Sequence, residues 1–234
     1  MMKQQFPACI LGLVTIGQSP RSDILPGLKP FLPQDQPLVQ AGALDGLTRK
    51  EIARLAPRTG DYVLHTRLRG GSTATVGREQ ILPLVQSAID QMVEEGADPI
   101  LLLCTGEFPE LQSPVMLIEP DRVLLNLVRG LAPKSMGVIV PLPVQADLLI
   151  RKWDKVDTKR TVAAATPYGD SDEILRSAAE FAESRLDVVV MDCMGYTGEH
   201  KRLVRAATGK PVILAASAVA RVVGELLDTG EGWQ

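Results

Sequence analysis

Short apolar runs alternate with amphipathic stretches along nearly the whole chain, and this alternation constrains the fold more than any other feature. The runs contain few polar residues and lie at 9–16, 62–66, 99–104, 137–140, 161–165, 187–193 and 211–215, with a weaker one at 37–44. Such continuous apolar character is typical of strands buried on both faces, as in a parallel sheet with helices on either side. Helical stretches lie between the runs, at 48–56, 77–95, 171–184, 198–207 and 218–227. Thr48 and Glu51 form a capping-box pattern that opens the first, and Asp170 is the candidate cap of the third. Strands that alternate with helices predict an α/β fold.

Two pairs of segments echo each other within the chain. Residues 98–106 resemble residues 187–195, because in both an Asp precedes a Cys by six positions and a Gly follows that Cys by two. Residues 12–18 likewise resemble residues 137–143. The sequence therefore predicts two pseudo-symmetric, Rossmann-like subdomains, each with a small parallel sheet of similar strand order, around an interdomain cleft.

A length of 234 residues fits one large domain or two small ones, at about 150 residues per domain. The Pro-rich stretch at 109–120 is the candidate crossing between the halves. We expect residues 1–117 plus 215–234 to form the N-terminal α/β subdomain, and residues 118–214 to form the C-terminal one.

Composition excludes several classes of function. The chain has 25 basic and 28 acidic side chains, whereas general nucleic-acid binding requires a basic footprint. No apolar run approaches the roughly 20 residues that a membrane helix needs. The first residues lack an apolar stretch followed by a small-residue cleavage site, which argues against a signal peptide. We therefore expect a cytoplasmic protein with no nucleic-acid or membrane partner.

The chain has three cysteines, Cys9, Cys104 and Cys193, which are far apart in sequence. This is too few, and the wrong parity, for a disulfide framework, and zinc-type spacing is absent. Two histidines without a carboxylate cluster do not make a metal site. We expect reduced thiols and no metal. Cys9 lies inside an apolar run and is interpreted as a core residue.

Cys104 and Cys193 each end a predicted strand at matching places in the two halves. The carboxyl ends of strands border the ligand crevice in open α/β sheets, so the two thiols are expected to approach one cleft from opposite sides. Such a pair suits stereoinversion, in which one thiolate removes a proton and the opposite thiol delivers one to the other face. A sulfur–sulfur separation of roughly 7 to 10 Å would leave room for one tetrahedral carbon. The alternative is that both are small buried hydrophobes, the usual role of a free Cys.

Residues near the strand ends are candidates for binding a carboxylate. Gly106 and Gly195 would let backbone N–H groups approach a carboxylate or a developing enolate closely. In the loop after the first strand, Ser19 can cap the next helix and Arg21 adds a positive charge near its start. An ordinary strand-to-helix turn with a surface arginine is the alternative. The dinucleotide pattern G-x-G-x-x-G is absent from this loop.

The basic, Gly-rich stretch at 65–78 lies between a strand and the start of a long helix, where backbone amides favour anions. It is a candidate substrate-binding loop or mobile lid, with Arg78 as a further contact, and a plain surface loop is the alternative. It lacks the Lys-Ser/Thr ending of a Walker loop, so nucleotide hydrolysis is not expected.

Several polar residues beside the thiols have more than one interpretation. Asp192 is expected to orient a partner or to raise the pKa of a neighbouring thiol by charge repulsion. Thr105 and Tyr196 flank the thiols and are candidate hydrogen-bond donors. His200 is a candidate general base, but a solvated first-turn residue is the favoured interpretation. His65 is interpreted as a strand residue rather than a ligand.

Four segments, in the same order, resemble the AroM family of bacterial proteins: 15–21, 118–122, 138–141 and 191–195. The likeness spans nearly the whole chain. That family looks like a branch of the aspartate/glutamate/hydantoin racemase superfamily, whose enzymes have two pseudo-symmetric α/β domains, one Cys from each, and no pyridoxal cofactor. The resemblance implies that Cys104 and Cys193 are the catalytic pair, with Gln18 and Arg21 facing the ligand.

The residues beside the thiols depart from the pattern of those racemases. The racemases commonly have Cys-Asn-Thr at the first thiol and Gly-Cys-Thr at the second, where this chain has Cys104-Thr105-Gly106 and Asp192-Cys193-Met194. Because these residues lie beside the thiols, the departure affects the prediction of the substrate more than the prediction of the fold. Relatives in the superfamily also include decarboxylases and cis–trans isomerases, and fold alone does not decide function.

The leading hypothesis is an isomerase: a cofactor-independent racemase or epimerase for a small carboxylate or hydantoin-like molecule, with Cys104 and Cys193 as the acid/base pair. The alternatives are a decarboxylase or isomerase that uses one thiol, and a regulatory protein that binds a small anion without turnover. We expect no cofactor and a small-molecule carboxylate as partner, and a homo-oligomer is compatible with the sequence. The expected substrate-binding residues are Gln18, Ser19, Arg21, Arg78, Thr105, Gly106, Met194, Gly195 and Tyr196.

Overall fold

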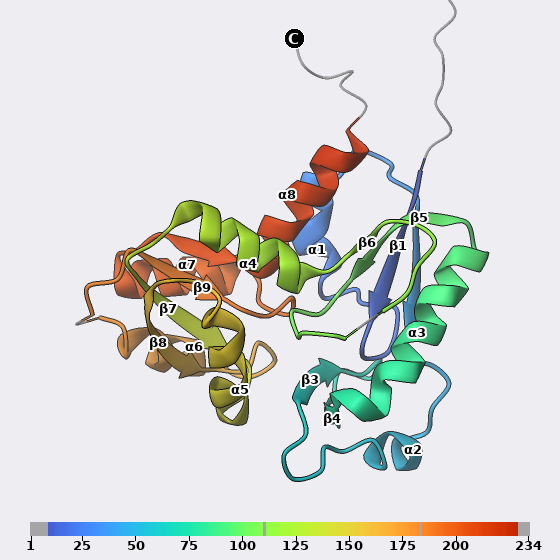
Figure 1. The fold of residues 1–234 in the computed structure, drawn as a ribbon, viewed down its shortest axis with the longest axis horizontal. Helices are drawn as coiled ribbons and strands as arrows, with labels where there is room; N and C mark the ends of the chain where they lie inside the picture. Colours follow the sequence, from blue (N-terminus) through green and yellow to red (C-terminus); the bar gives the residue numbers. More distant parts are fainter. Residues whose placement is uncertain (1–8, 110, 183, 229–234) are drawn as a thin grey trace, which may run out of the picture.

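A computed structural model describes residues 9–109, 111–182 and 184–228. Two four-stranded parallel sheets form the two lobes seen in Figure 1. The first sheet contains, in spatial order, β2 (Leu38–Gly42), β1 (Ile10–Thr15), β5 (Ala97–Leu102) and β6 (Leu117–Ile118). The second contains β10 (Val212–Leu214), β9 (Val188–Met191), β7 (Ser135–Val140) and β8 (Lys159–Ala164).

The two sheets have the same strand order. In each, the first strand along the chain (β1 or β7) lies between the second and the third, and the fourth pairs with the third. The N–H of Leu103, just after β5, donates to the carbonyl of Val14. In the other half, the N–H of Asp192, just after β9, donates to the carbonyl of Ile139. The prediction of two α/β halves with parallel sheets of similar strand order is confirmed.

The central strands are buried on both faces, which explains why their sequences show no polar alternation. In β1, Leu11 and Leu13 face one hydrophobic core, while Val14 on the opposite face packs in a second. In β7, Val138 joins the same core as Leu11, whereas Ile139 faces a third. One core therefore runs between the two sheets and joins the halves.

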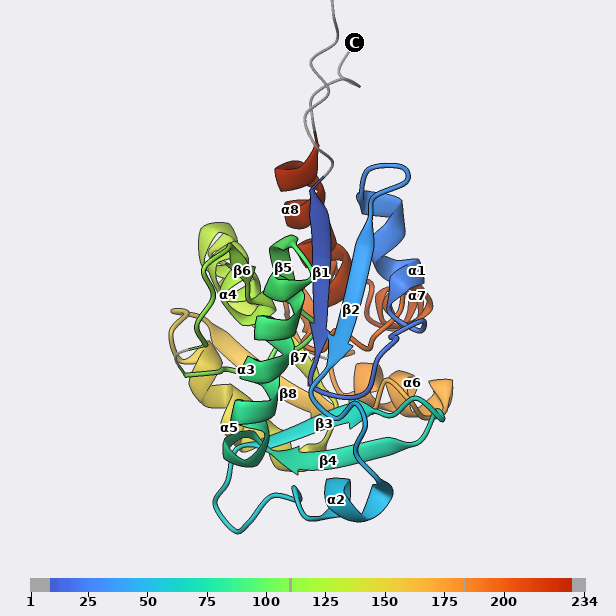
Figure 2. The ribbon, with the colours of Figure 1, turned by 90° about the vertical axis from the view of Figure 1, so that its right-hand side faces the viewer.

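Helices cover the sheets and fill the seam between them (Figure 2). They are α1 (Leu25–Leu28), the short 3-10 helix η1 (Lys29–Phe31), α2 (Arg49–Ala53), α3 (Arg78–Glu94), α4 (Pro120–Leu131), α5 (Pro143–Trp153), α6 (Ser171–Ala179), α7 (Gly198–Thr208) and α8 (Ala215–Leu227). In the seam, α4 and α8 bury Leu124 and Val219 in the shared core. The sequence signals for two helix starts are confirmed, because Thr48 forms a capping box with Glu51 and Asp170 caps α6.

The stretch at 65–78, interpreted as a loop, is instead largely an antiparallel hairpin of β3 (Val63–Arg67) and β4 (Thr73–Gly77). The alternation of Thr with apolar residues in β4 suits a strand that is exposed on one face. The hairpin pairs with neither parallel sheet and lies just beyond the carboxyl ends of β1 and β2, in the lower part of Figure 2. Most of this stretch is therefore regular β-structure.

Two further expectations differ from the structure. Cys9 is exposed and lies just before β1, so its interpretation as a core residue is wrong; within that run, full burial begins at Leu11. The last helix, α8, begins at Ala215, directly after β10.

The division into subdomains stays a prediction, and its ends at 1–8 and 229–234 lie outside the described residues. In the structure, α8 packs on α1 and η1 and also on α4. Over the residues that the structure describes, no helix has the length and apolarity required to cross a membrane.

Candidate active site

Cys104 and Cys193 line one cavity at the carboxyl ends of the strands, between the two sheets. The cavity has a volume of about 30 Å³, enough for roughly one or two water molecules. Its walls come from both halves and from the hairpin, which contributes Leu64, His65 and Thr66. The expectation that both thiols face one cleft thus agrees with the geometry.

The two thiols occupy equivalent positions, two residues after the end of the third strand of each sheet. The N–H of Gly106 donates to the sulfur of Cys104 at 3.3 Å, and the N–H of Gly195 donates to the sulfur of Cys193 at 3.4 Å. A Cβ atom at either glycine would lie 2.6 Å from a neighbouring side chain. A larger residue at either position would therefore force Leu64 or Tyr168 to shift.

The thiols are protonated at neutral pH, and they are not equivalent. Burial raises the pKa of Cys104 to about 12; the Gly106 hydrogen bond opposes this rise, and charge on Cys193 adds to it. Burial also raises the pKa of Cys193, to about 11, and the positive charge of Arg21 opposes this rise. The repulsion by Asp192 that the sequence indicated raises the pKa of both thiols. The positive charge of Arg21 therefore favours the thiolate form of Cys193.

Arg21 is a buried, fixed cation at the cavity wall. It follows β1 and donates from Nη1 to the hydroxyl of Thr15 at 3.1 Å. Its other nitrogens hold both oxygens of Asp23 at 2.9 Å, and Nη2 also donates to the hydroxyl of Tyr168 at 3.1 Å. Burial lowers the pKa of Arg21, but the contacts with Asp23 and Tyr168 outweigh burial, so the net pKa is above its usual value. The guanidinium therefore stays charged without solvent, as carboxylate binding requires.

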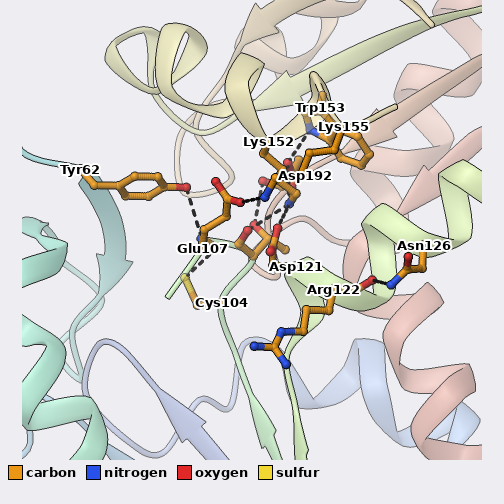
Figure 3. A network of polar contacts seen from close by, with 12 residues as sticks. Tyr62, Cys104, Glu107, Asp121, Arg122, Asn126, Lys152, Trp153, Lys155 and Asp192 are labelled. Atoms are coloured by element: carbon orange, nitrogen blue, oxygen red, sulfur yellow. Dashed lines mark hydrogen bonds and ion pairs between the residues drawn. The ribbon is translucent and has the colours of Figure 1, made fainter. Parts of the chain in front are cut away.

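A buried lysine connects the loops that carry the two thiols (Figure 3). Lys152, fully buried at the end of α5, donates to the carbonyl of Thr105 at 3.1 Å and to the carboxylate of Asp192 at 3.0 Å. Its third partner is Asp121, 2.9 Å away. The hydroxyl of Thr105 donates to the carbonyl of Asp192 at 3.1 Å, and the indole of Trp153 donates to its carboxylate at 3.0 Å. One network therefore sets the relative position of Cys104 and Cys193.

This network buries one cation, Lys152, together with the carboxylates of Asp121 and Asp192. Burial lowers the pKa of Lys152, but the attraction of Asp192 and Asp121 outweighs burial and raises it overall. Burial raises the pKa of Asp121, against the opposing effect of Lys152. Lys152 is therefore the cation that makes it tolerable to bury two carboxylates side by side.

The hairpin bridges the two halves over the cavity. The side-chain amide of Gln145, on α5, donates to the carbonyl of Val63 at 3.0 Å. His65 lies 3.5 Å from the hydroxyl of Thr166, which follows β8, and its ring stacks at a tilt against Tyr168. Ligand access therefore requires the hairpin or one half to move.

Five of the expected binding residues line the cavity: Arg21, Thr105, Gly106, Met194 and Gly195. Gln18 and Ser19 do not. The side chain of Gln18 donates to the carbonyl of Leu44 at 3.1 Å and also accepts from the backbone of the hairpin. The hydroxyl and N–H of Ser19 both donate to Asp45. In the structure both residues fix the loop after β1, and their ligand role stays a prediction.

Arg78 and Tyr196 also lie outside the cavity lining. The guanidinium of Arg78 donates to the carbonyl of Glu107 at 3.2 Å and stacks on the ring of Tyr62 at 4.6 Å. The hydroxyl of Tyr196 donates to the carbonyl of Ala165 at 2.6 Å. Both residues support the walls of the site.

Sequence reasoning missed Tyr168, Gln145 and Lys152. Tyr168 follows the end of β8, a strand-end position like those of the thiols, and this signal was present. Lys152 stands beside Arg151, and nothing in the sequence separates it from a surface lysine. His200 closes a helix cap with Thr197, as its favoured interpretation implied.

Across the described residues, no three His, Cys, Asp or Glu side chains gather closely enough to hold a metal ion. No curated protein matches the chain in sequence at a significant level. A family model described as AroM protein matches residues 11–227.

Solved structures with low sequence identity share the fold. Unliganded arylmalonate decarboxylase is 14% identical, with a TM-score of 0.61 over 97% of this chain and 94% of that one. Glutamate racemase from Francisella tularensis subsp. tularensis SCHU S4, in complex with D-glutamate, is 12% identical, with a TM-score of 0.62 over 94% and 81%. Allantoin racemase from Klebsiella pneumoniae is 12% identical, with a TM-score of 0.64 over 94% and 87%. The chain therefore has the two-subdomain fold of the aspartate/glutamate racemase superfamily.

Proposed function

The chain belongs to the AroM family, and we propose that it is a cofactor-independent racemase or epimerase of a small carboxylate or hydantoin-like molecule. One observation carries the proposal: two thiols, at equivalent strand ends of two equivalent sheets, line the same cavity. A reducing compartment such as the cytoplasm would keep both thiols free.

The two thiols have distinct roles in this mechanism. Cys193, whose thiolate form is favoured by Arg21, takes the proton from the carbon next to the carboxylate. The electron pair left on that carbon moves into the carboxylate as an enolate. Cys104 then gives its proton to the opposite face, so the product has inverted configuration and the two thiols have exchanged protonation states. Arg21 and the N–H groups at the thiol loops stabilise the negative charge that develops on the oxygens.

The substrate and the thiols are enclosed during this reaction. The present cavity, at about 30 Å³, is too small for an organic substrate, so the hairpin or one half must move before the substrate enters. Closure afterwards excludes water, which would otherwise protonate the enolate on either face.

Isotope exchange tests the proposal and identifies the substrate in the same experiment. The protein is incubated in D₂O with a pool of small chiral carboxylates and hydantoins, and mass spectrometry follows deuterium at the carbon next to the carboxyl group. The proposal predicts protein-dependent exchange in at least one compound. Thermal stabilisation by a pool member without exchange into any of them would instead indicate a non-catalytic anion-binding protein.

A one-thiol enzyme, a decarboxylase or isomerase, is a second candidate, and the electrostatic asymmetry of the site favours it. Arg21, which is paired with one carboxylate, that of Asp23, opposes the rise in the pKa of Cys193, whereas Lys152, the cation that acts on Cys104, is paired with two carboxylates. In this candidate Cys193 alone transfers the proton. Loss of activity in Cys193→Ser together with full activity in Cys104→Ser would identify it.

The rate of exchange is expected to rise with pH. Cys193 must lose its proton to act as base, and its pKa is about 11. Below that value each pH unit raises the thiolate fraction, and hence kcat/KM, by roughly tenfold. The profile should rise from pH 7 and level off near pH 11. In Arg21→Gln the profile should shift to higher pH, because the opposing positive charge is gone; a profile flat from pH 7 to 10 in the wild type contradicts the assignment.

A further inference from the structure

A second cavity, of about 360 Å³, lies where α1 meets the first residues of α7 and α8. This volume is within the range of about 300 to 1,000 Å³ found for small-molecule sites. The cavity is separate from the thiol cavity, but the two share Ile24 as a wall. Figure 1 shows α1 beside α8, and the two helices contact each other.

Positive charge is in excess at this cavity. Lys201 from α7 and Arg221 from α8 both line it. Burial lowers the pKa of Lys201, and the charges of Arg221 and Arg205 lower it further. Asp23 is the one acidic residue among the described residues that line the cavity. Arg21 already binds both oxygens of its carboxylate. An anion in the cavity would therefore relieve repulsion between cations that no lining group neutralises.

The rest of the wall is apolar. Ile24, Phe31 and Leu214 contribute aliphatic and aromatic surface, and one proline in α1 and one in η1 add more. The guanidinium of Arg221 lies 4.3 Å from the centre of the Phe31 ring, stacked on its face. A flat apolar group beside this pair would be covered on one side while its charged end reaches Lys201.

We propose that this cavity is a second ligand site, for a small organic anion with a flat apolar body and a carboxylate or phosphate end. Lys201 and Arg221 hold the anionic group, and Ile24, Phe31 and Leu214 cover the body. The site does not contain either cavity thiol, so its ligand is bound rather than transformed by them.

Calorimetric titration of the full chain with phenyl phosphate tests the site, with uncharged benzyl alcohol as the matched probe. Lys201→Gln and Arg221→Gln should each weaken the binding of phenyl phosphate by about tenfold or more, because each removes a charge-assisted contact. Arg202→Gln is the matched control, because Arg202 is exposed on the same helix and does not line the cavity. It should leave the dissociation constant within about twofold.

Folding and the location of binding are checked in the same series. Lys201→Gln removes repulsion with two arginines, so its melting temperature should equal or exceed that of the wild type. Equal binding of phenyl phosphate and benzyl alcohol would overturn the proposal. A second result would also overturn it: phenyl phosphate still binds to Lys201→Gln and to Arg221→Gln but does not bind to Arg21→Gln. That result would place the anion in the thiol cavity. The readout is binding, so it is independent of whether the thiols catalyse a reaction.

Discussion

Replacing Cys193 with serine is expected to lower inversion by about a thousandfold, the typical contribution of a general base, and to lower by a similar factor the proton exchange of the enantiomer whose proton faces Cys193. A serine hydroxyl loses its proton far less readily than a thiol, and the same burial that raises the pKa of Cys193 would act on it. Cys104→Ser should lower inversion by a similar factor, because the hydroxyl is a poorer proton donor to the enolate. Both rates are measured with the compound identified by isotope exchange.

The chain provides its own control for these substitutions. Cys9 is exposed and lies outside the cavity, so Cys9→Ser should have wild-type activity. Serine and cysteine are close in size, so the melting temperatures of all three variants should stay near that of the wild type. Wild-type activity in both cavity variants would rule out thiol chemistry.

Lys152→Met is expected to have the largest effect on stability, about 3 to 5 kcal/mol in the free energy of unfolding. Methionine has nearly the length of lysine and fills the same space, so the loss is electrostatic. Without the ammonium, Asp192 and Asp121 remain buried, close together and unpaired. The loop contact to Thr105 is lost as well, so the variant should also lose exchange activity.

Urea unfolding at two pH values checks the cause of this loss. Burial already raises the pKa of Asp121, and without Lys152 its pKa rises further, so protonation at the lower of the two pH values should neutralise it and reduce the deficit. The control is Lys155→Met, just after α5, which removes an exposed ion pair with Glu107 and should cost less than about 1 kcal/mol. Equal stability of Lys152→Met and the wild type would contradict the role of Lys152.

Most of the fold was predictable from the sequence because it depends on local patterns. The apolar runs mark strands whose two faces are buried, and the matching segments 98–106 and 187–195 occupy equivalent third strands. The same pair of matching segments predicted that Cys104 and Cys193 lie at strand ends. These features are visible without knowing which elements meet in space.

The features that the sequence did not reveal depend on contacts between distant segments. Lys152 is buried only because Asp121 and Asp192 meet it from two other elements. Gln18 was assigned to the ligand, but its amide bonds to Leu44 and to the hairpin, whose position over the cavity has no local signal. Cys9 shares its run with buried residues, yet it lies one position before the strand begins.

The most direct test of the two-thiol claim follows deuterium uptake and inversion separately for each enantiomer of the substrate. In Cys104→Ser, the enantiomer whose proton faces Cys193 should still exchange with solvent but should not invert, and the other enantiomer should do neither. In Cys193→Ser, the enantiomer whose proton faces Cys104 should exchange with solvent without inverting, and the other enantiomer should do neither. Retention of inversion by Cys104→Ser would show that one thiol is sufficient and would contradict the account.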